Sequence, residues 1–121
     1  LGEVINAPID LQLSLWDVVQ PDIVVVLAPN RIITTTKIKG VPDLVIEILS
    51  PSNRNHDLEL KKQLYEQFSV PEYWIVDPEN QTIKRYSLGE NGTFADPEVF
   101  TESITFDGIL GGAVVDLKRV W

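Results

Sequence analysis

The sequence GVPDLVIEILSPSNRNHDLELKKQLYEQFSVPEYWIVD, residues 40–77, contains two apolar runs separated by a helical pattern. The first run, 44–49, is almost continuously aliphatic, which is typical of a strand covered on both faces. The second run, 72–76, ends at Asp77 before Pro78, and proline cannot continue a central strand. A strand, a helix of about three turns and a second strand form a crossover unit. We therefore expect two parallel neighbouring strands with a right-handed connection.

The helix between these strands is predicted over 57–68, after the turn-forming residues 50–53. On a helical wheel of about 100° per residue, one arc collects the apolar residues, which are Leu58, Leu60, Leu64, Tyr65 and Phe68. Lys61 falls inside this arc, whereas Lys62 lies on the polar side and is predicted to be solvated. We therefore expect Lys61 to point toward the sheet, with Asp57 on the same arc one turn earlier.

Glu47 interrupts the first apolar run, where an unpaired charge is expensive to bury. A cation, a proton or an outward-facing position must compensate it. Asp43 shares its strand face, but four strand residues separate the two carboxylates by roughly 13 Å, too far for one ion. Asp22 precedes a different apolar run, 23–27, and can therefore lie beside Glu47. The candidate site is Asp22, Glu47 and Lys61.

Two carboxylates and a lysine suit metal-assisted hydrolysis of a phosphodiester bond. Mg²⁺ commonly binds through one or two carboxylates and keeps the rest of its shell for water and phosphate oxygens. The bound metal polarises the phosphate and lowers the pKa of a water molecule. Lys61 can orient that water or stabilise charge in the transition state. Asp57 would hold the ammonium in place or contact a metal-bound water.

Composition limits the alternatives. The length of 121 residues predicts one domain, 1–121, and the absence of cysteine excludes disulfides and thiolate chemistry and fits a cytoplasmic protein. No apolar run is long enough to span a membrane. The net charge of −8 argues against a surface that coats nucleic acid, so any such contact is expected to be local, metal-mediated or made by other residues. The chain begins at Leu1 within an apparent strand pattern, which predicts a fragment of a longer protein.

The remaining segments are predicted to be strands and turns. Residues 3–7 and 11–15 are expected to pair, and further strands are expected at 81–87 and 93–101. Residues 31–39 fit a strand or a loop with a helical turn, and residues 114–121 fit a helix or a strand. Scattered cations on an acidic domain are usually solvated, and this expectation covers Lys37, Lys39, Lys84 and Arg85.

Several motifs together resemble the Uma family of bacterial restriction-endonuclease-like proteins. The resemblance is carried by Pro21-Asp22, Pro42 to Ser52, Asp57 with Lys61 and Tyr65, and Val70 to Pro78. It implies the α/β core of the PD-(D/E)XK nucleases, a mixed β-sheet with flanking helices. It also implies that Asp22, Glu47 and the main-chain carbonyl of Ile48 bind Mg²⁺ or Mn²⁺.

The sequence departs from this family pattern at two places. The usual lysine two residues after the glutamate is replaced by Leu49, and Lys61 is expected to supply its function from the helix. The resemblance also implies an N-terminal helix and strand region with a further acidic residue, which is expected to lie outside the given sequence.

Two function hypotheses follow. The first is a homodimeric endonuclease acting on DNA, with Asp22, Glu47 and Lys61 catalytic and Asp57 supporting. The second is a catalytically inactive nuclease-fold domain that serves protein interaction or assembly.

Overall fold

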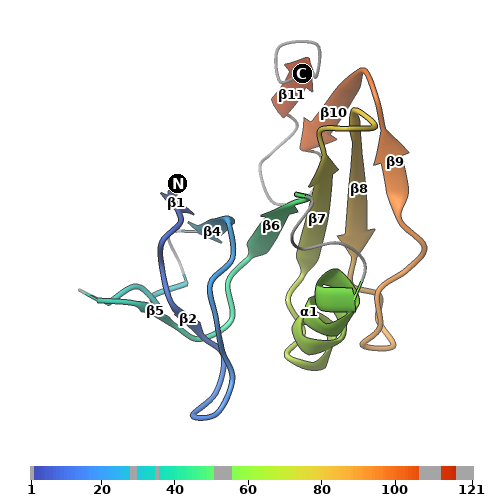
Figure 1. Cartoon of the computed structure of the whole chain (residues 1–121). Helices are drawn as coiled ribbons and strands as arrows, with labels where there is room; N and C mark the ends of the chain where they lie inside the picture. Colours follow the sequence, from blue (N-terminus) through green and yellow to red (C-terminus); the bar gives the residue numbers. More distant parts are fainter. Residues whose placement is uncertain (1, 28–29, 35, 51–55, 107–112, 117–121) are drawn as a thin grey trace.

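A six-stranded mixed sheet forms the centre of the molecule (Figure 1). The computed structural model describes residues 2–27, 30–34, 36–50, 56–106 and 113–116. In the order in which they lie side by side, the strands of this sheet are β1 (Gly2–Asn6), β4 (Ile23–Leu27), β6 (Leu44–Ile48), β7 (Glu72–Asp77), β8 (Thr82–Ser87) and β9 (Glu98–Phe100). A three-stranded sheet has the order β3 (Val18–Val19), β2 (Leu11–Gln12) and β5 (Ile38–Lys39). Strands β10 (Ser103–Phe106) and β11 (Ala113–Asp116) form an antiparallel pair.

Residues 40–77 form the predicted crossover unit. Strands β6 and β7 are parallel neighbours, with Glu47 opposite Ile75, and α1 (His56–Gln67) lies between them in the sequence. The helix ends where Ser69 adopts a φ of 59°. There the amide of Val70 donates to the carbonyl of Tyr65 at 3.0 Å, which satisfies one of the last carbonyls of the helix. The prediction of a parallel strand pair joined through a helix is confirmed.

The two faces of the large sheet carry separate apolar clusters. On the face that packs against α1 and the three-stranded sheet, the buried residues are Leu11, Leu13, Val24, Val26, Ile38, Val45, Tyr65, Val70 and Tyr73. On the opposite face they are Val25, Leu44, Trp74 and Ile83. Alternation along each strand separates the two sets, so neighbouring Tyr73 and Trp74 belong to different clusters. Both aromatic side chains are buried, as predicted.

The predicted pairing of residues 3–7 with 11–15 is wrong. Strand β1 instead pairs antiparallel with β4, at the edge of the large sheet. Strand β2 is only two residues long because the chain turns back at Ser14, where the amide of Leu13 donates to the carbonyl of Asp17 at 2.9 Å. This turn joins β2 to β3 and gives a separate hairpin.

Other segments differ from prediction in smaller ways. Of the predicted flanking helices, the described residues contain one, α1. Residues 31–39 contain β5 and a bridge between Ile33 and Ile38, so the strand alternative holds there. Strand β11 begins at Ala113, while residues 117–121 lie outside the described part. Leu60 was placed on the covered arc, yet it is 53% exposed, because it lies at the margin of that arc.

Within the described ranges, none of the helical segments has the length and apolarity needed to cross a bilayer.

Candidate metal and phosphodiester site

The register of β4 and β6 brings Asp22 beside Glu47. These antiparallel strands pair Ile23 with Ile46. Continuing the register by one residue sets Asp22 opposite Glu47, where Cβ atoms are typically about 5 Å apart. Side chains two residues apart on a strand point to the same face of a sheet. Asp22 therefore shares the face of Val24, and Glu47 shares the face of Val45, which is the face that α1 covers. Acids from two strands therefore meet, as the sequence predicted.

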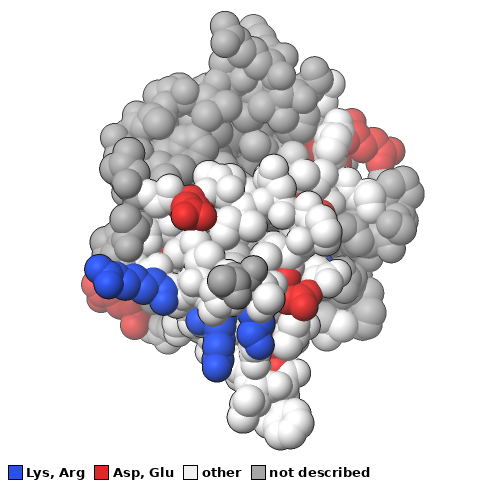
Figure 2. Space-filling view, turned by 90° about the vertical axis from the view of Figure 1, so that its left-hand side faces the viewer, with Lys and Arg blue, Asp and Glu red and all other residues white. Residues whose placement is uncertain are grey.

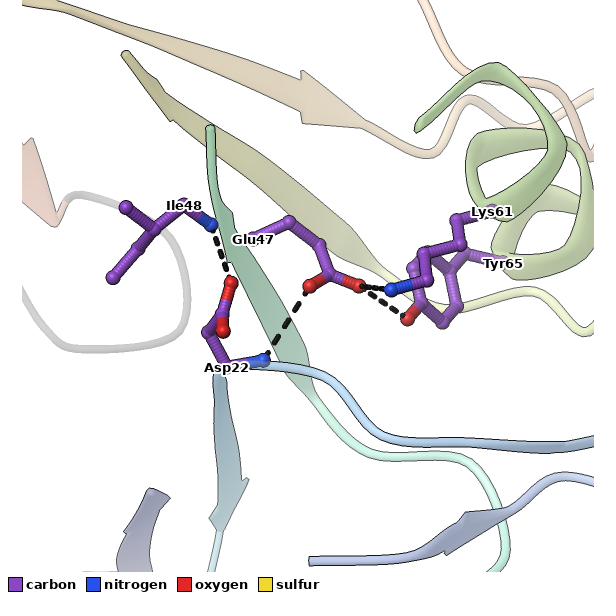
Figure 3. Close-up of polar contacts among 5 residues, drawn as sticks. All are labelled: Asp22, Glu47, Ile48, Lys61 and Tyr65. Carbon is purple, nitrogen blue, oxygen red and sulfur yellow. Dashed lines mark hydrogen bonds and ion pairs between the residues drawn. The ribbon is translucent and has the colours of Figure 1, made fainter. Parts of the chain in front are cut away.

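Each acid accepts a hydrogen bond from the main chain of the other strand (Figure 3). The amide of Ile48 donates to Asp22 Oδ2 at 2.7 Å. The amide of Asp22 donates to Glu47 Oε1 at 3.4 Å, a long and weak hydrogen bond. The reciprocal contacts fix the two carboxylates relative to each other. The described contact from Ile48 to Asp22 is made by its amide, and its carbonyl remains a predicted metal ligand.

The other oxygen of Glu47 is held by α1. Lys61 Nζ lies 3.1 Å from Glu47 Oε2, and the Tyr65 hydroxyl donates to the same oxygen at 3.0 Å. Lys61 and Tyr65 are four residues apart on the helix, so their side chains emerge on one face and converge on one acceptor. The side chain of Glu47 is 1% exposed and that of Lys61 is 21% exposed. Lys61 therefore points inward, as its place on the helical wheel predicted.

The electrostatic balance of the site disfavours the charged form of Glu47. Burial raises the pKa of Glu47 above its usual value. The charge of Lys61 and the hydrogen bonds from Lys61 and Tyr65 oppose this rise, and the negative charge of Asp22 adds to it. Burial outweighs the opposing contacts, so one ammonium group does not fully compensate the charged form of Glu47. A second cation near both carboxylates would stabilise that form.

The donor set fits Mg²⁺ or Mn²⁺ better than Zn²⁺. Among the described residues, no group donates a hydrogen bond to Asp22 Oδ1, and Glu47 Oε1 has only its long contact with the amide of Asp22. The described residues contain no cluster of three His, Cys, Asp or Glu side chains that could form a closed cage. Two hard oxygen donors leave room for water and a phosphate, which is the usual environment of Mg²⁺. Structural zinc sites instead require about four protein ligands.

Two further acids, Asp43 and Asp57, are close to the site in the sequence. Asp43 accepts hydrogen bonds from the amide of Leu27 at 2.7 Å and from the side chain of Asn30 at 3.3 Å. It therefore stabilises the chain after β4, in agreement with its exclusion from the predicted site. The side chain of Asp57, predicted to support Lys61, lies outside the described part of the structure. The hydrogen bond from Tyr65 to Glu47 is not among the sequence predictions, which place Tyr65 on the apolar arc and in the family motif, although its spacing of four residues from Lys61 is typical of two side chains on one helix face.

A pocket of about 190 Å³ lies beside the site, between α1 and strands β7 and β8. Ile75, the strand neighbour of Glu47, lines it together with Lys62 and Lys84. Lys62, predicted to be solvated, is half-buried, and its Nζ lies 4.7 Å from the centre of the Tyr86 ring. The aromatic face attracts the ammonium and the lysine stem packs on it.

Arg85 also departs from its predicted solvation. It is 5% exposed, and its Nη2 lies 3.0 Å from Glu98 Oε1. Its Nε lies 3.8 Å from Glu72, and its guanidinium carbon lies 4.8 Å from the centre of the Phe100 ring. Arg85 thus stabilises the sheet face opposite the candidate site and is not available for a phosphate.

Comparisons with known proteins agree with this architecture. The model of the family Uma2, described as "Putative restriction endonuclease", matches residues 1–117. No curated protein matches the chain. Among solved structures, the chain is similar to a putative nuclease belonging to DUF820 from Anabaena variabilis, with a TM-score of 0.74 and 20% sequence identity. The match covers 98% of this chain and 67% of that one, and at this identity it shows a shared fold.

Proposed function

The chain belongs to the Uma2 family, and from this premise we propose that it is a metal-dependent endonuclease that hydrolyses phosphodiester bonds in DNA. The observation that carries the proposal is the meeting of three groups from separate elements. Asp22 and Glu47 come from neighbouring strands, and Lys61 reaches Glu47 from the helix. The buried carboxylate has a raised pKa, which is a feature of functional sites as well as of structural ion pairs.

Each residue has a proposed role in hydrolysis. Asp22 and Glu47 would hold Mg²⁺ or Mn²⁺, with the carbonyl of Ile48 as a further oxygen donor. When bound, the metal would supply charge to the phosphate and lower the pKa of a water molecule. Lys61 favours the charged form of Glu47 against the effect of burial and, being partly exposed, can also stabilise negative charge that develops on the phosphate.

Tyr65 acts as a positioning residue in this proposal. Its hydroxyl fixes Glu47 Oε2, so that Oε1 is the oxygen that faces Asp22. A carboxylate held in one rotamer does not have to be reordered when a ligand binds, which saves conformational entropy.

A cleavage assay tests the proposal. Circular and linear DNA are incubated with Mn²⁺ or Mg²⁺, and the wild type is compared with Glu47→Gln and Asp22→Asn. Each change keeps the side-chain shape but removes a negative oxygen donor, so we expect cleavage to fall by about 100-fold or more. Glu59→Gln is the matched control, because Glu59 is exposed on α1. Cleavage by Glu47→Gln at the wild-type rate would contradict the proposal.

The second candidate function is a catalytically inactive domain that serves protein interaction or assembly. One observation favours it: Glu47 Oε2 is already paired with Lys61 and Tyr65, as in a structural buried ion pair. Calorimetric titration with Mn²⁺ separates the two candidates. An active site should bind the ion with an affinity that depends on Asp22, whereas an inactive one should show no such dependence. A homodimer in the cytoplasm remains part of the endonuclease proposal.

A further inference from the structure

The hairpin between β2 and β3 exposes two large apolar side chains at its tip. Leu15 is 79% exposed and Trp16 is 90% exposed. The turn that presents them is well ordered by hydrogen bonds. Ser14 Oγ accepts from the amides of Trp16 and Asp17, both at 3.2 Å, and donates to Asp17 Oδ2 at 2.7 Å. The exposure is therefore a feature of a defined turn, and an exposed tryptophan at such a place indicates a contact with a ligand or partner.

Positive charge lies next to this tip. Strand β5 pairs with β2, with Lys39 opposite Gln12, and Lys39 lines a hollow together with Leu15. Residues 23–42 contain three cations and no acid, although the whole chain has a net charge of −8. Lys37 and Lys39 form no ion pair with any residue that the structure describes. Figure 2 views the molecule from the side where β5 lies in Figure 1, and Lys and Arg side chains lie in the lower part of that face, with Asp and Glu side chains beside them.

We propose that this hairpin surface, defined as Leu15, Trp16, Lys37 and Lys39, binds single-stranded DNA beside the candidate site. Trp16 would stack on a base and the two lysines would contact backbone phosphates. An aromatic platform combined with cations is the usual construction of sequence-independent single-strand binding. The choice of DNA rests on the proposed nuclease function, and the hairpin surface adds the part of the molecule that holds the strand.

Charge complementarity favours a nucleic acid over a protein partner. Cations without ion-pair partners attract a polyanion locally, although the chain as a whole is acidic. Two acids lie close to this surface. Asp17 accepts a hydrogen bond from Ser14 within the turn, and Asp10, whose carbonyl accepts from the amide of Ile38, accepts a hydrogen bond from the Gln20 side chain. An unpaired base also suits Trp16 better than a base in a duplex, because stacking on it requires no prior unstacking.

The chain connects the hairpin surface directly to the site. Trp16 and Asp22 are six residues apart, which is at most about 20 Å of extended chain. A DNA strand with its phosphate at Asp22 would therefore reach Trp16 within a few nucleotides.

Binding without cleavage tests this inference. Fluorescence anisotropy is measured in EDTA with labelled oligothymidylate of about 12 nucleotides and with a duplex of about 12 base pairs. Trp16→Ala should weaken binding of the single strand about tenfold or more. Trp16→Leu, which keeps apolar bulk without an aromatic ring, should not restore binding. Lys37→Gln with Lys39→Gln should lower the slope of log affinity against log salt by about 1.4, since each phosphate contact on a single strand contributes about 0.7.

The control is Lys84→Gln, which removes an exposed lysine on β8 and should leave affinity nearly unchanged. The inference is overturned if the wild type does not bind the single strand, if it prefers the duplex, or if Lys84→Gln weakens binding as much as the hairpin variants. It is also overturned if Trp16→Leu binds like the wild type, or if Trp16→Ala changes only the oligomeric state. Binding with the expected variant effects but without any cleavage in Mn²⁺ would refute the nuclease proposal alone. Cleavage that is indifferent to Trp16 and Lys39 would refute this inference alone.

Discussion

Replacing Lys61 with methionine should make the stability of the fold depend more steeply on pH. Methionine keeps an unbranched apolar side chain but removes the ammonium that lies 3.1 Å from Glu47 Oε2. The carboxylate left behind is 1% exposed, so water cannot replace the missing cation. Tyr65 still donates one hydrogen bond to Glu47, and the two carboxylates still face each other.

The size of the effect follows from the burial of the pair. A hydrogen bond to a charged group contributes about 1.5 to 3 kcal/mol, and breaking a fully buried ion pair costs about 3 to 5 kcal/mol. The Lys61 side chain is 21% exposed, which places this pair toward the lower values. We expect Lys61→Met to lower the free energy of unfolding by about 2 kcal/mol at mildly alkaline pH.

The pH dependence has a definite sign. Because burial raises the pKa of Glu47 in the folded state, the folded protein binds more protons than the unfolded chain between the two pKa values. Stability contributed by this group is therefore present at low pH and is lost as the pH rises through the folded-state pKa. Lys61 opposes the rise, so its removal raises the pKa of Glu47 further. The deficit of the variant should shrink at low pH, because a protonated Glu47 needs no cation.

Urea unfolding in EDTA, followed by tryptophan fluorescence from about pH 5.5 to about pH 8.5, measures this deficit. Lys62→Met is the matched control, since Lys62 lies over the Tyr86 ring and its loss should have an effect independent of pH. In a Glu47→Gln background, Lys61→Met should add little. A deficit that is constant with pH, or unchanged in that background, would refute the electrostatic reasoning and leave only a packing role for Lys61.

Two further predictions concern neighbouring hydrogen bonds. Tyr65→Phe should lower the unfolding free energy by about 1 to 2 kcal/mol at alkaline pH and by less at acidic pH, because the hydroxyl lowers the pKa of Glu47. The phenylalanine ring keeps the packing against Tyr73, whose ring centre lies 5.0 Å away. Urea unfolding at two pH values measures the difference. Arg85→Met should cost about 2 to 3 kcal/mol in the same measurement, because it removes the cation 3.8 Å from Glu72, whose side chain is 12% exposed. Glu98 is 59% exposed, so a smaller loss from Arg85→Met than from Glu98→Gln would count against this reasoning.

The crossover unit and the inward lysine could be predicted because both depend on patterns within short stretches. Two long apolar runs flank a helix with a single covered face, and that arrangement has few alternatives. Lys61 shares its arc with Leu64 and Tyr65, so any orientation that buries these two also turns Lys61 inward. Leu60 shows the limit of the method. A helical wheel shows which residues share an arc, but it does not show how much of that arc the sheet covers. Leu60 lies on the part of the arc that the sheet does not cover, and it is 53% exposed.

Contacts that depend on the register between strands could not be read from local patterns. The pairing of Trp74 with Arg85, and of Arg85 with Glu98, places the buried arginine beside its acid. No feature of the segment 81–87 indicates that a partner from β9 will lie opposite. The β2–β3 hairpin was missed for a related reason, because the turn at Ser14 is closed by side-chain hydrogen bonds and not by glycine or proline.

The two charged clusters on opposite faces of the sheet differ in where their excess charge lies. Arg85 with Glu72 and Glu98 carries one positive and two negative charges, and Lys61 with Asp22 and Glu47 carries the same formal total. In the Arg85 cluster the excess falls on Glu98, which is 59% exposed and can be stabilised by water. In the other cluster Glu47 is 1% exposed, and Asp22 beside it is partly exposed. Glu47 is therefore the acid that water can stabilise least, and this is the physical reason to test for a metal at Asp22 and Glu47.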